Sequence, residues 1–477
     1  MFLAHAVWLA AASLIVVGVV RFFTVRRFYR GLPGPPHSLL LGHLKIIGEY
    51  MRRMPPGSHV QAAITQIQQD YNLPDIFYLD LWPIGPRFVV CSGADAAATV
   101  STFPQSTLVL DVLGPTIGTT FIEVTNGPLW KNLHRVFAPS LTPASVKGYH
   151  DGIVDEAAAL HARLHARLQD SDVVDLNYEL GKFTFGVVCN VVGITVKHGA
   201  YDWVRRATRR MGVFLTSNNP ITQWVASRDV KRYLKSAAAG MEVLPRGGLP
   251  ENVLFENAIG FIIAGTGSTA DILSYAFMLL GSHPDALQKV RDEHDRVLDL
   301  RNGHKELKYT TAVIQETLRL FPVGMVVRAP QDATIQHRGK TYNVENQQIM
   351  VPSHTLHYNA EYFDEPAKFK PERFLGEIPR NAYRPFERGL RSCLGQNLAM
   401  EEMRMALVML ARSFDFELQE PVLKQRFSHT ELDTKIGVHA FQGPGFTAGP
   451  HGPVMMKVTK NVPWTGCEEI SGRSREK

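Results

Sequence analysis

Cysteine is scarce in this chain: 477 residues include four, at Cys91, Cys189, Cys393 and Cys467. They form no CxxC pair and no dense framework, so neither a disulfide scaffold nor a structural zinc site is supported. The sequence also lacks any Asn-x-Ser/Thr glycosylation acceptor. Together these absences favour a body with reduced thiols that faces the cytosol.

The chain has no strong charge imbalance either. Lys and Arg total 51 and Asp and Glu total 45, which leaves a net charge of +6. An excess this small over such a length does not indicate nucleic-acid binding. Internal repeats and low-complexity tracts are missing as well, while 45% of the residues are hydrophobic, enough for a large core.

The N-terminus carries a long apolar run. From Phe2 to Val20 the only residue that could be charged is His5, and this length is sufficient to cross a bilayer as one helix. Basic residues follow the run, at Arg21, Arg26, Arg27 and Arg30. A signal peptide has its basic region first, and the positive-inside rule keeps the flanking body on the cytosolic side. We expect a transmembrane anchor over residues 1–23; a cleaved signal or an interfacial helix is the alternative.

A basic, proline-rich segment follows over residues 24–43. Its "GLPGPP" stretch at Gly31–Pro36 resists helix formation and predicts a short stiff stalk. Residues 44–477 then form the body. Strands are expected at Ile76–Leu81 and Arg87–Cys91, with short strand-like pieces near Thr334–Val351. Helical patterns dominate the rest, for example over residues 151–169, 256–281 and 284–299. The sequence therefore predicts a mainly α body with small β-sheets.

Cys393 lies in a distinctive stretch of sequence, "FERGLRSCLGQN" from Phe386 to Asn397. A helical pattern begins directly after Cys393, so its sulfur would lie at a helix N-terminus, where an anion is favoured. A thiolate is the form of cysteine that binds metal. Gly389 and Gly395 suit a tight turn or a close approach to something flat. The alternative is a buried structural cysteine before an ordinary helix.

The spacing Phe386-x-x-Gly389-x-Arg391-x-Cys393-x-Gly395 resembles the haem-binding signature of the cytochrome P-450 family, of the microsomal, fungal-like type. The resemblance implies a cytochrome P-450 fold and one catalytic domain behind the anchor. It also implies that Cys393 is the axial ligand of a haem b (iron protoporphyrin IX), with Phe386, Gly389 and Arg391 beside it.

Other stretches carry the same resemblance. Glu316-x-x-Arg319 is similar to the family's Glu-x-x-Arg motif, and Arg373 in "PERF" to the third member of its buried ionic cluster. The cluster's implied role is structural. Trp130 and Arg328 resemble haem contacts of the family, and His134 stands at the position of a third. By resemblance, residues 103–128 and 323–327 line the substrate cavity, and their apolar character favours a lipophilic substrate.

The stretch "AGTGSTA" at Ala264–Ala270 lies inside a long uncharged run. In the resemblance this run is the helix that crosses the oxygen-binding face, and its glycines leave room there. Gly267 and Ser268 stand where the family has an acid and a threonine, so the hydroxyls of Ser268 and Thr269 are the expected catalytic groups. Asp271, one turn later, could replace the acid. Gly265-x-Gly267-x-x-Ala270 also matches a dinucleotide-binding fingerprint, which would require a preceding strand.

The resemblance implies a haem-thiolate monooxygenase of the endoplasmic reticulum membrane, single-pass with the body facing the cytosol. Its substrate would be a secondary metabolite, terpenoid, polyketide, alkaloid or steroid-like compound. Electrons would come from NADPH through NADPH-cytochrome P-450 reductase, docking on a basic surface. That surface would include Arg384, Arg388, Arg391 and Arg404. Open alternatives are a reductase-independent isomerase or dehydratase, a haem carrier or sensor, and a dinucleotide-binding oxidoreductase.

Overall fold

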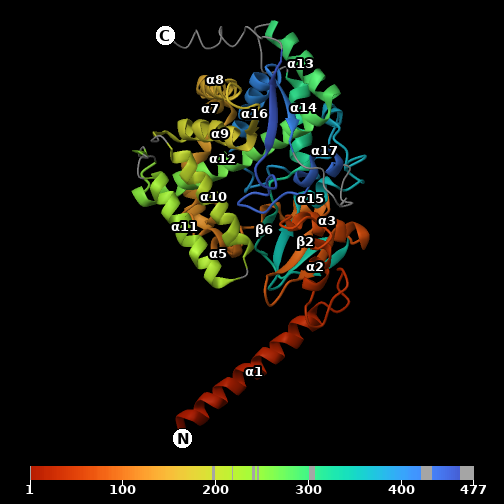
Figure 1. The fold of residues 1–477 in the computed structure, drawn as a ribbon. Coiled ribbons are helices and arrows are strands. Elements are labelled where there is room, and N and C mark those ends of the chain that lie inside the picture. The colour runs from red at the N-terminus through yellow and green to blue at the C-terminus, as the bar shows by residue number, and fades with distance from the viewer. Residues whose placement is uncertain are drawn as a thin grey trace.

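Helices make up most of the chain, as the sequence predicts (Figure 1). The computed structural model describes residues 2–195, 199–217, 219–238, 242–243, 247–299, 307–419 and 432–461, and Cys467 lies outside these ranges. The helices are α1 (Phe2–Phe28), α2 (Leu44–Met51), α3 (Val60–Asp70), α4 (Ala94–Thr99), α5 (Thr107–Leu113), α6 (Gly127–Phe137), α7 (Pro143–Gly148), α8 (His150–Arg167), α9 (Leu176–Val192), α10 (Ala200–Thr216), α11 (Pro220–Ala238), α12 (Glu251–Ser282), α13 (Pro284–Asp299), α14 (Lys308–Leu320), α15 (Ser353–His357), α16 (Gln396–Ala411) and α17 (Asp433–Ile436).

Short strands form small sheets beside the helices. They are β1 (Ile76–Asp80), β2 (Arg87–Cys91), β3 (Val173–Asp175), β4 (Ile194–Thr195), β5 (Glu242–Val243), β6 (Val326–Arg328), β7 (Thr334–His337), β8 (Lys340–Asn343), β9 (Gln348–Val351), β10 (Phe414–Leu418) and β11 (Met455–Lys460). The largest described sheet has the order β1-β2-β9-β6, with β2 and β9 parallel and the other pairs antiparallel. The strands predicted around residues 76–91 and 334–351 are confirmed.

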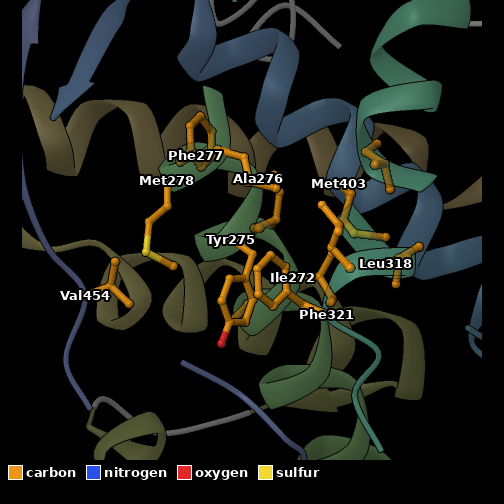
Figure 2. Packing of buried hydrophobic residues seen from close by; sticks show 14 of the residues in the cluster. Ile272, Tyr275, Ala276, Phe277, Met278, Leu318, Phe321, Met403 and Val454 are labelled. Atoms are coloured by element: carbon orange, nitrogen blue, oxygen red, sulfur yellow. The ribbon is translucent and has the colours of Figure 1, made fainter. Parts of the chain in front are cut away.

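Helix α12 runs through the centre of the body. Its apolar residues face neighbours on every side, as expected of a helix buried in a large core. Figure 2 shows Tyr275 and Phe277 of α12 among residues from α14 and α16. The Tyr275 ring stacks on Phe321 with centroids 3.8 Å apart, and Phe277 lies 4.6 Å from Phe416.

The central position of α12 decides two expectations. Residues 260–264 are helical, so the strand that a dinucleotide fingerprint requires is not there, and that interpretation is wrong. Among the described residues, α12 is also the helix that is long and apolar enough to cross a membrane. Of its most apolar window, 72% is buried inside the protein, as in the core helix of a folded body.

Helix α1 extends away from the body (Figure 1), but its last turn is docked on it. Arg26 is 3% exposed, forms an ion pair with Asp80, and donates to the carbonyls of Leu39 at 3.0 Å and Trp82 at 3.0 Å. The segment predicted as a stalk also lies against β1, because the Tyr78 amide donates to the Pro33 carbonyl at 2.8 Å. Contacts with the body, as well as proline stiffness, therefore hold this segment.

Candidate active site

A cavity of about 420 Å³ lies between α12 and the loop that precedes α16. Side chains far apart in the sequence meet around it: Trp130 and His134 of α6, Ser268 and Thr269 of α12, and Cys393 of the loop. Phe386 and Arg391 from the same loop line it too. We call this space the main cavity.

The loop holds Cys393 at the edge of a helix. The Cys393 amide donates to the Phe386 carbonyl at 2.8 Å, and α16 begins three residues after the cysteine. The Cys393 side chain is open to the main cavity, but the surrounding protein desolvates the thiol and raises its pKa to about 11, while hydrogen bonds from the backbone N–H groups of Gly395 and Gln396 oppose the rise. The thiol therefore keeps its proton at neutral pH unless a metal ion replaces it.

Gly389 is required by the loop itself. Its φ of +83° is in the left-handed region, and a Cβ there would lie 2.6 Å from the carbonyl oxygen of Ser101. Gly389 therefore makes its close approach to the protein's own backbone at Ser101. Gly395 has an ordinary φ of −80° as the N-cap of α16, and a Cβ on it would lie 3.8 Å from the Cys393 sulfur.

Two buried arginines near the main cavity have hydrogen-bond donors without an acceptor. In the part of the chain that the structure describes, Nε and Nη1 of Arg384 and Nη2 of Arg328 are buried without a hydrogen-bond partner. Arg384 is 1% exposed and Arg328 is 2% exposed. A buried charge with unmet donors is costly, so an anionic group between these side chains would be strongly stabilised. Glu387 lies 2.8 Å from Arg384 and 4.0 Å from Arg328, and donors of both arginines remain without a partner. Together with the thiol in the cavity wall, these donors fit a haem with its propionates.

Arg384 corrects an expectation. The sequence places it on a basic docking surface, whereas the structure buries it beside the main cavity, with Nη2 donating to Ser101 Oγ and Glu387 Oε2, both at 2.8 Å. No local pattern distinguishes it from its neighbour Arg388. Its environment depends on Ser101, which is 283 positions away in the chain.

The Arg391 guanidinium is bound by other residues of the protein. Its guanidinium carbon lies 4.4 Å from the centroid of the Trp130 ring, and Nη2 donates at 2.6 Å to both the Thr125 carbonyl and Asn126 Oδ1. Burial lowers the pKa of Arg391 to about 10. The His134 ring lies 5.0 Å from that of Trp130. The structure thus brings these three predicted haem contacts together along one side of the cavity.

Helix α12 contributes the hydroxyl residues Ser268 and Thr269 to the lining of the main cavity. Ser268 Oγ donates to the Ala264 carbonyl at 2.7 Å, and Thr269 is 3% exposed. A Cβ on Gly265 would lie 2.7 Å from Val188 Cγ2, so this glycine allows α9 to pack against α12. Gly267 faces away from the main cavity, into a second one. Gly265 lines the main cavity as expected, whereas the expectation that Gly267 also leaves room there is wrong.

The predicted ionic cluster is assembled as a unit. Arg319 donates to Glu316 through Nε at 2.7 Å and Nη2 at 2.8 Å, and the Arg373 Nε lies 3.1 Å from the same carboxylate. Glu316 and Arg319 are fully buried. Arg319 Nη1 also donates to the carbonyls of His357 and Pro366. These bonds join α14 to the segment that leads towards the cysteine loop.

Two further observations complete the lining. Phe121 and Ile122 of the range 103–128, and Val323 to Val326 of the range 323–327, face the main cavity. Glu402 of α16 lines the main cavity as well; it is 1% exposed, and burial raises its pKa well above the usual range. Glu402 comes four residues after Leu398 and four before Ala406, so its spacing places it on the apolar face of the helix, and this signal could have found it.

Comparison with known proteins gives one consistent result. A family model described as Cytochrome P450 matches residues 234–439. Cytochrome P450 monooxygenase ptmG of Penicillium ochrochloron is 26% identical, with 94% of each chain covered. Human cytochrome P450 3A7 is 36% identical, over 66% of this chain and 74% of the relative. A bifunctional cytochrome P450/NADPH–P450 reductase 2 of Bacillus subtilis is 26% identical, over 66% of this chain and 33% of the relative.

Proposed function

Because the chain belongs to the cytochrome P450 family and is a monooxygenase of that family, we propose that it oxidises a lipophilic small molecule with O₂ and electrons from NADPH. The observation that carries the proposal is the main cavity, where the Cys393 thiol opens onto the same space as Ser268 and Thr269. Its walls are largely apolar, which suits a lipophilic substrate. Secondary metabolites, terpenoids, polyketides and steroid-like compounds meet this description.

Named residues would hold the haem. Cys393, in the loop shaped by Phe386 and Gly389, would bind the haem iron through its sulfur, and the donors of Arg384 and Arg328 that lack a partner would bind the propionates. Trp130, His134 and Arg391 would border it on the side of α6. When bound, a thiolate-ligated haem supplies the oxygen chemistry. The protein's part is to position the substrate, exclude bulk water and bring protons to the cavity through hydroxyls such as Ser268 and Thr269.

The ionic cluster of Glu316, Arg319 and Arg373 would act structurally. Arg319 joins α14 to the carbonyls of His357 and Pro366, and the Tyr383 hydroxyl donates to the Gln315 carbonyl at 3.0 Å. These contacts support a role in fixing the approach to the cysteine loop.

The N-terminal region would anchor the enzyme. Of the predicted anchor over residues 1–23, the part from Phe2 onwards lies in the projecting helix α1, and large apolar side chains such as Trp8, Leu14 and Ile15 are more than 60% exposed. Exposed apolar side chains over this length suit a lipid environment. We place the protein in the endoplasmic reticulum membrane as a single-pass protein, with residues 24–43 docked on the catalytic domain of residues 44–477, facing the cytosol.

The proposed electron donor is a separate NADPH-cytochrome P450 reductase. The name of the Bacillus relative joins both activities in one chain, and the present chain aligns with one third of that protein. This match supports pairing the haem domain with an NADPH-dependent reductase.

An omission experiment tests the reaction class. We expect product from the anchored protein with reductase, NADPH, oxygen and a panel of lipophilic precursors, and at least about a tenfold loss when any one of the first three is left out. The missing acid at Gly267 favours one second candidate, an isomerase or dehydratase that needs no reductase. Product should be measured by mass spectrometry. An undiminished amount in all three omissions would establish that candidate.

A further inference from the structure

A second cavity, of about 380 Å³, lies on the other side of α12 from Ser268. Gly267 and Asp271, one helical turn apart, both line it. Nothing within 4 Å would meet a Cβ on Gly267 except the Thr447 hydroxyl oxygen, at 3.9 Å. The place where the family's acid side chain would begin is therefore next to Thr447.

Asp271 is held in a defined position on this wall. Its Oδ1 accepts from Asn177 Nδ2 at 2.9 Å, and its Oδ2 accepts from Thr447 Oγ1 at 2.9 Å. A Cβ on Gly449 would lie 2.3 Å from Oδ2, so the backbone also packs against the carboxyl. Burial raises the pKa of Asp271 to about 6, and both hydrogen bonds oppose the rise. A group with this pKa takes up and releases protons near neutral pH.

Thr447 connects the two cavities. Its side chain lines the second cavity beside Asp271 and also lines the main cavity, where Ser268 and Thr269 lie. Phe446 lines both cavities as well, but its side chain has no exchangeable proton. Of these two side chains, Thr447 alone can both accept and donate a hydrogen bond.

We propose that Asp271 and Thr447 form a proton relay that carries protons from the second cavity to the main cavity in place of the missing acid at position 267. The proposal rests on the monooxygenase function. A protonated Asp271 donates to Thr447 Oγ, and the Thr447 hydroxyl passes its own proton to a water or hydroxyl in the main cavity. The Asp271 carboxylate is then reprotonated by water in the second cavity. Each group gains and loses one proton, and no electrons move along this path.

Other ionisable groups face the same carboxyl. Tyr201 of α10 and Tyr275 of α12 interact electrostatically with it. Arg205 and Arg209 of α10 and His451 line the same cavity. Burial raises the pKa of both tyrosines far above neutrality, so they stay protonated. His451 is the histidine among them, and a His451→Gln variant controls for its presence.

The test removes each member of the relay in the holoenzyme. Thr447→Val deletes the hydroxyl at nearly constant shape, Thr447→Ser keeps it, and Asp271→Asn removes the acid. With reductase, NADPH and the panel compound that the wild type converts, Thr447→Val and Asp271→Asn should give about tenfold less product per NADPH, because a positioned proton donor contributes about 10²–10⁴ to its step. The lost equivalents should appear as peroxide, and Thr447→Ser should retain the wild-type yield.

A second readout does not depend on turnover. Infrared difference spectra between pH 5 and pH 8 should show a carboxylic acid band with a midpoint near 6, absent in Asp271→Asn. In Thr447→Val the midpoint should rise, since the lost hydrogen bond favours the carboxylate. Product per NADPH should fall as pH rises through this midpoint in the wild type and in His451→Gln, and stay flat in Asp271→Asn.

Thr208→Val is the matched control. Its hydroxyl lines the second cavity but donates to the Arg205 carbonyl at 3.0 Å, within its own helix. Equal yields for Thr208→Val and Thr447→Val would overturn the relay, as would wild-type yields in Asp271→Asn. A wild type that consumes no NADPH in the presence of reductase would instead refute the monooxygenase function, and the relay with it.

Discussion

A Cys393→Ser protein should show no thiolate-type absorption in its reduced carbon monoxide complex, whereas the wild type should show it. Cys393 is the described cysteine whose side chain opens onto the main cavity. Cys91 and Cys189 are buried in other clusters of the core, and burial raises the pKa of each thiol to about 12. Serine has no sulfur, so it cannot provide the thiolate with which Cys393 would bind the iron.

The measurement is an absorption spectrum of each purified protein after reduction under carbon monoxide. Cys91→Ala is the control, since it removes a thiol from β2 and leaves the loop unchanged. Its spectrum should match that of the wild type. A thiolate-type band that persisted in Cys393→Ser would show that another residue binds the iron.

Removal of the Glu316 carboxylate should leave little folded, haem-loaded protein. In Glu316→Ala the fully buried guanidinium of Arg319 loses its carboxylate, and Arg373 loses the same partner. Breaking a buried ion pair from one side costs about 3–5 kcal/mol, because the remaining charge stays buried. A loss of this size is a large part of the stability of an ordinary domain.

The matched control is Glu372→Ala, in the same segment as Arg373. Glu372 pairs with Lys289 at 2.6 Å, but both side chains are over 40% exposed. Exposed pairs contribute about 0–1 kcal/mol, so this variant should retain nearly wild-type yield. Haem content per protein and thermal unfolding should be measured for both. Normal haem content and unfolding temperature in Glu316→Ala would contradict a structural role for the cluster.

Much of this arrangement is visible in the sequence because its signals are local. The spacing of apolar residues after Cys393 predicts the helix that the structure shows. Gly389 in the sequence indicates the tight turn before it. Strands β1 and β2 follow from short apolar runs around a Pro/Gly turn. The motif of Glu316 and Arg319 spans a single helical turn.

What could not be predicted depends on contacts between distant segments. Asp271 and Thr447 are 176 positions apart, so no pattern in either segment indicates the hydrogen bond between them. The same holds for Arg384, whose burial depends on Ser101, and for Gly265, whose need for a small side chain is set by Val188. Packing between elements decides such positions, and local propensity carries no information about it.

The docking of Arg26 has a practical consequence for producing the protein in water-soluble form. Consider a truncation that removes the apolar N-terminus together with the basic residues that follow it, as far as residue 30. Such a truncation would delete the guanidinium that pairs with Asp80, whose side chain is fully buried in the catalytic domain. A cut at or before residue 21 would discard the apolar run and retain Arg26 with its acceptors at Leu39 and Trp82. The first residue retained thus determines whether Asp80 keeps its arginine partner in the trimmed enzyme.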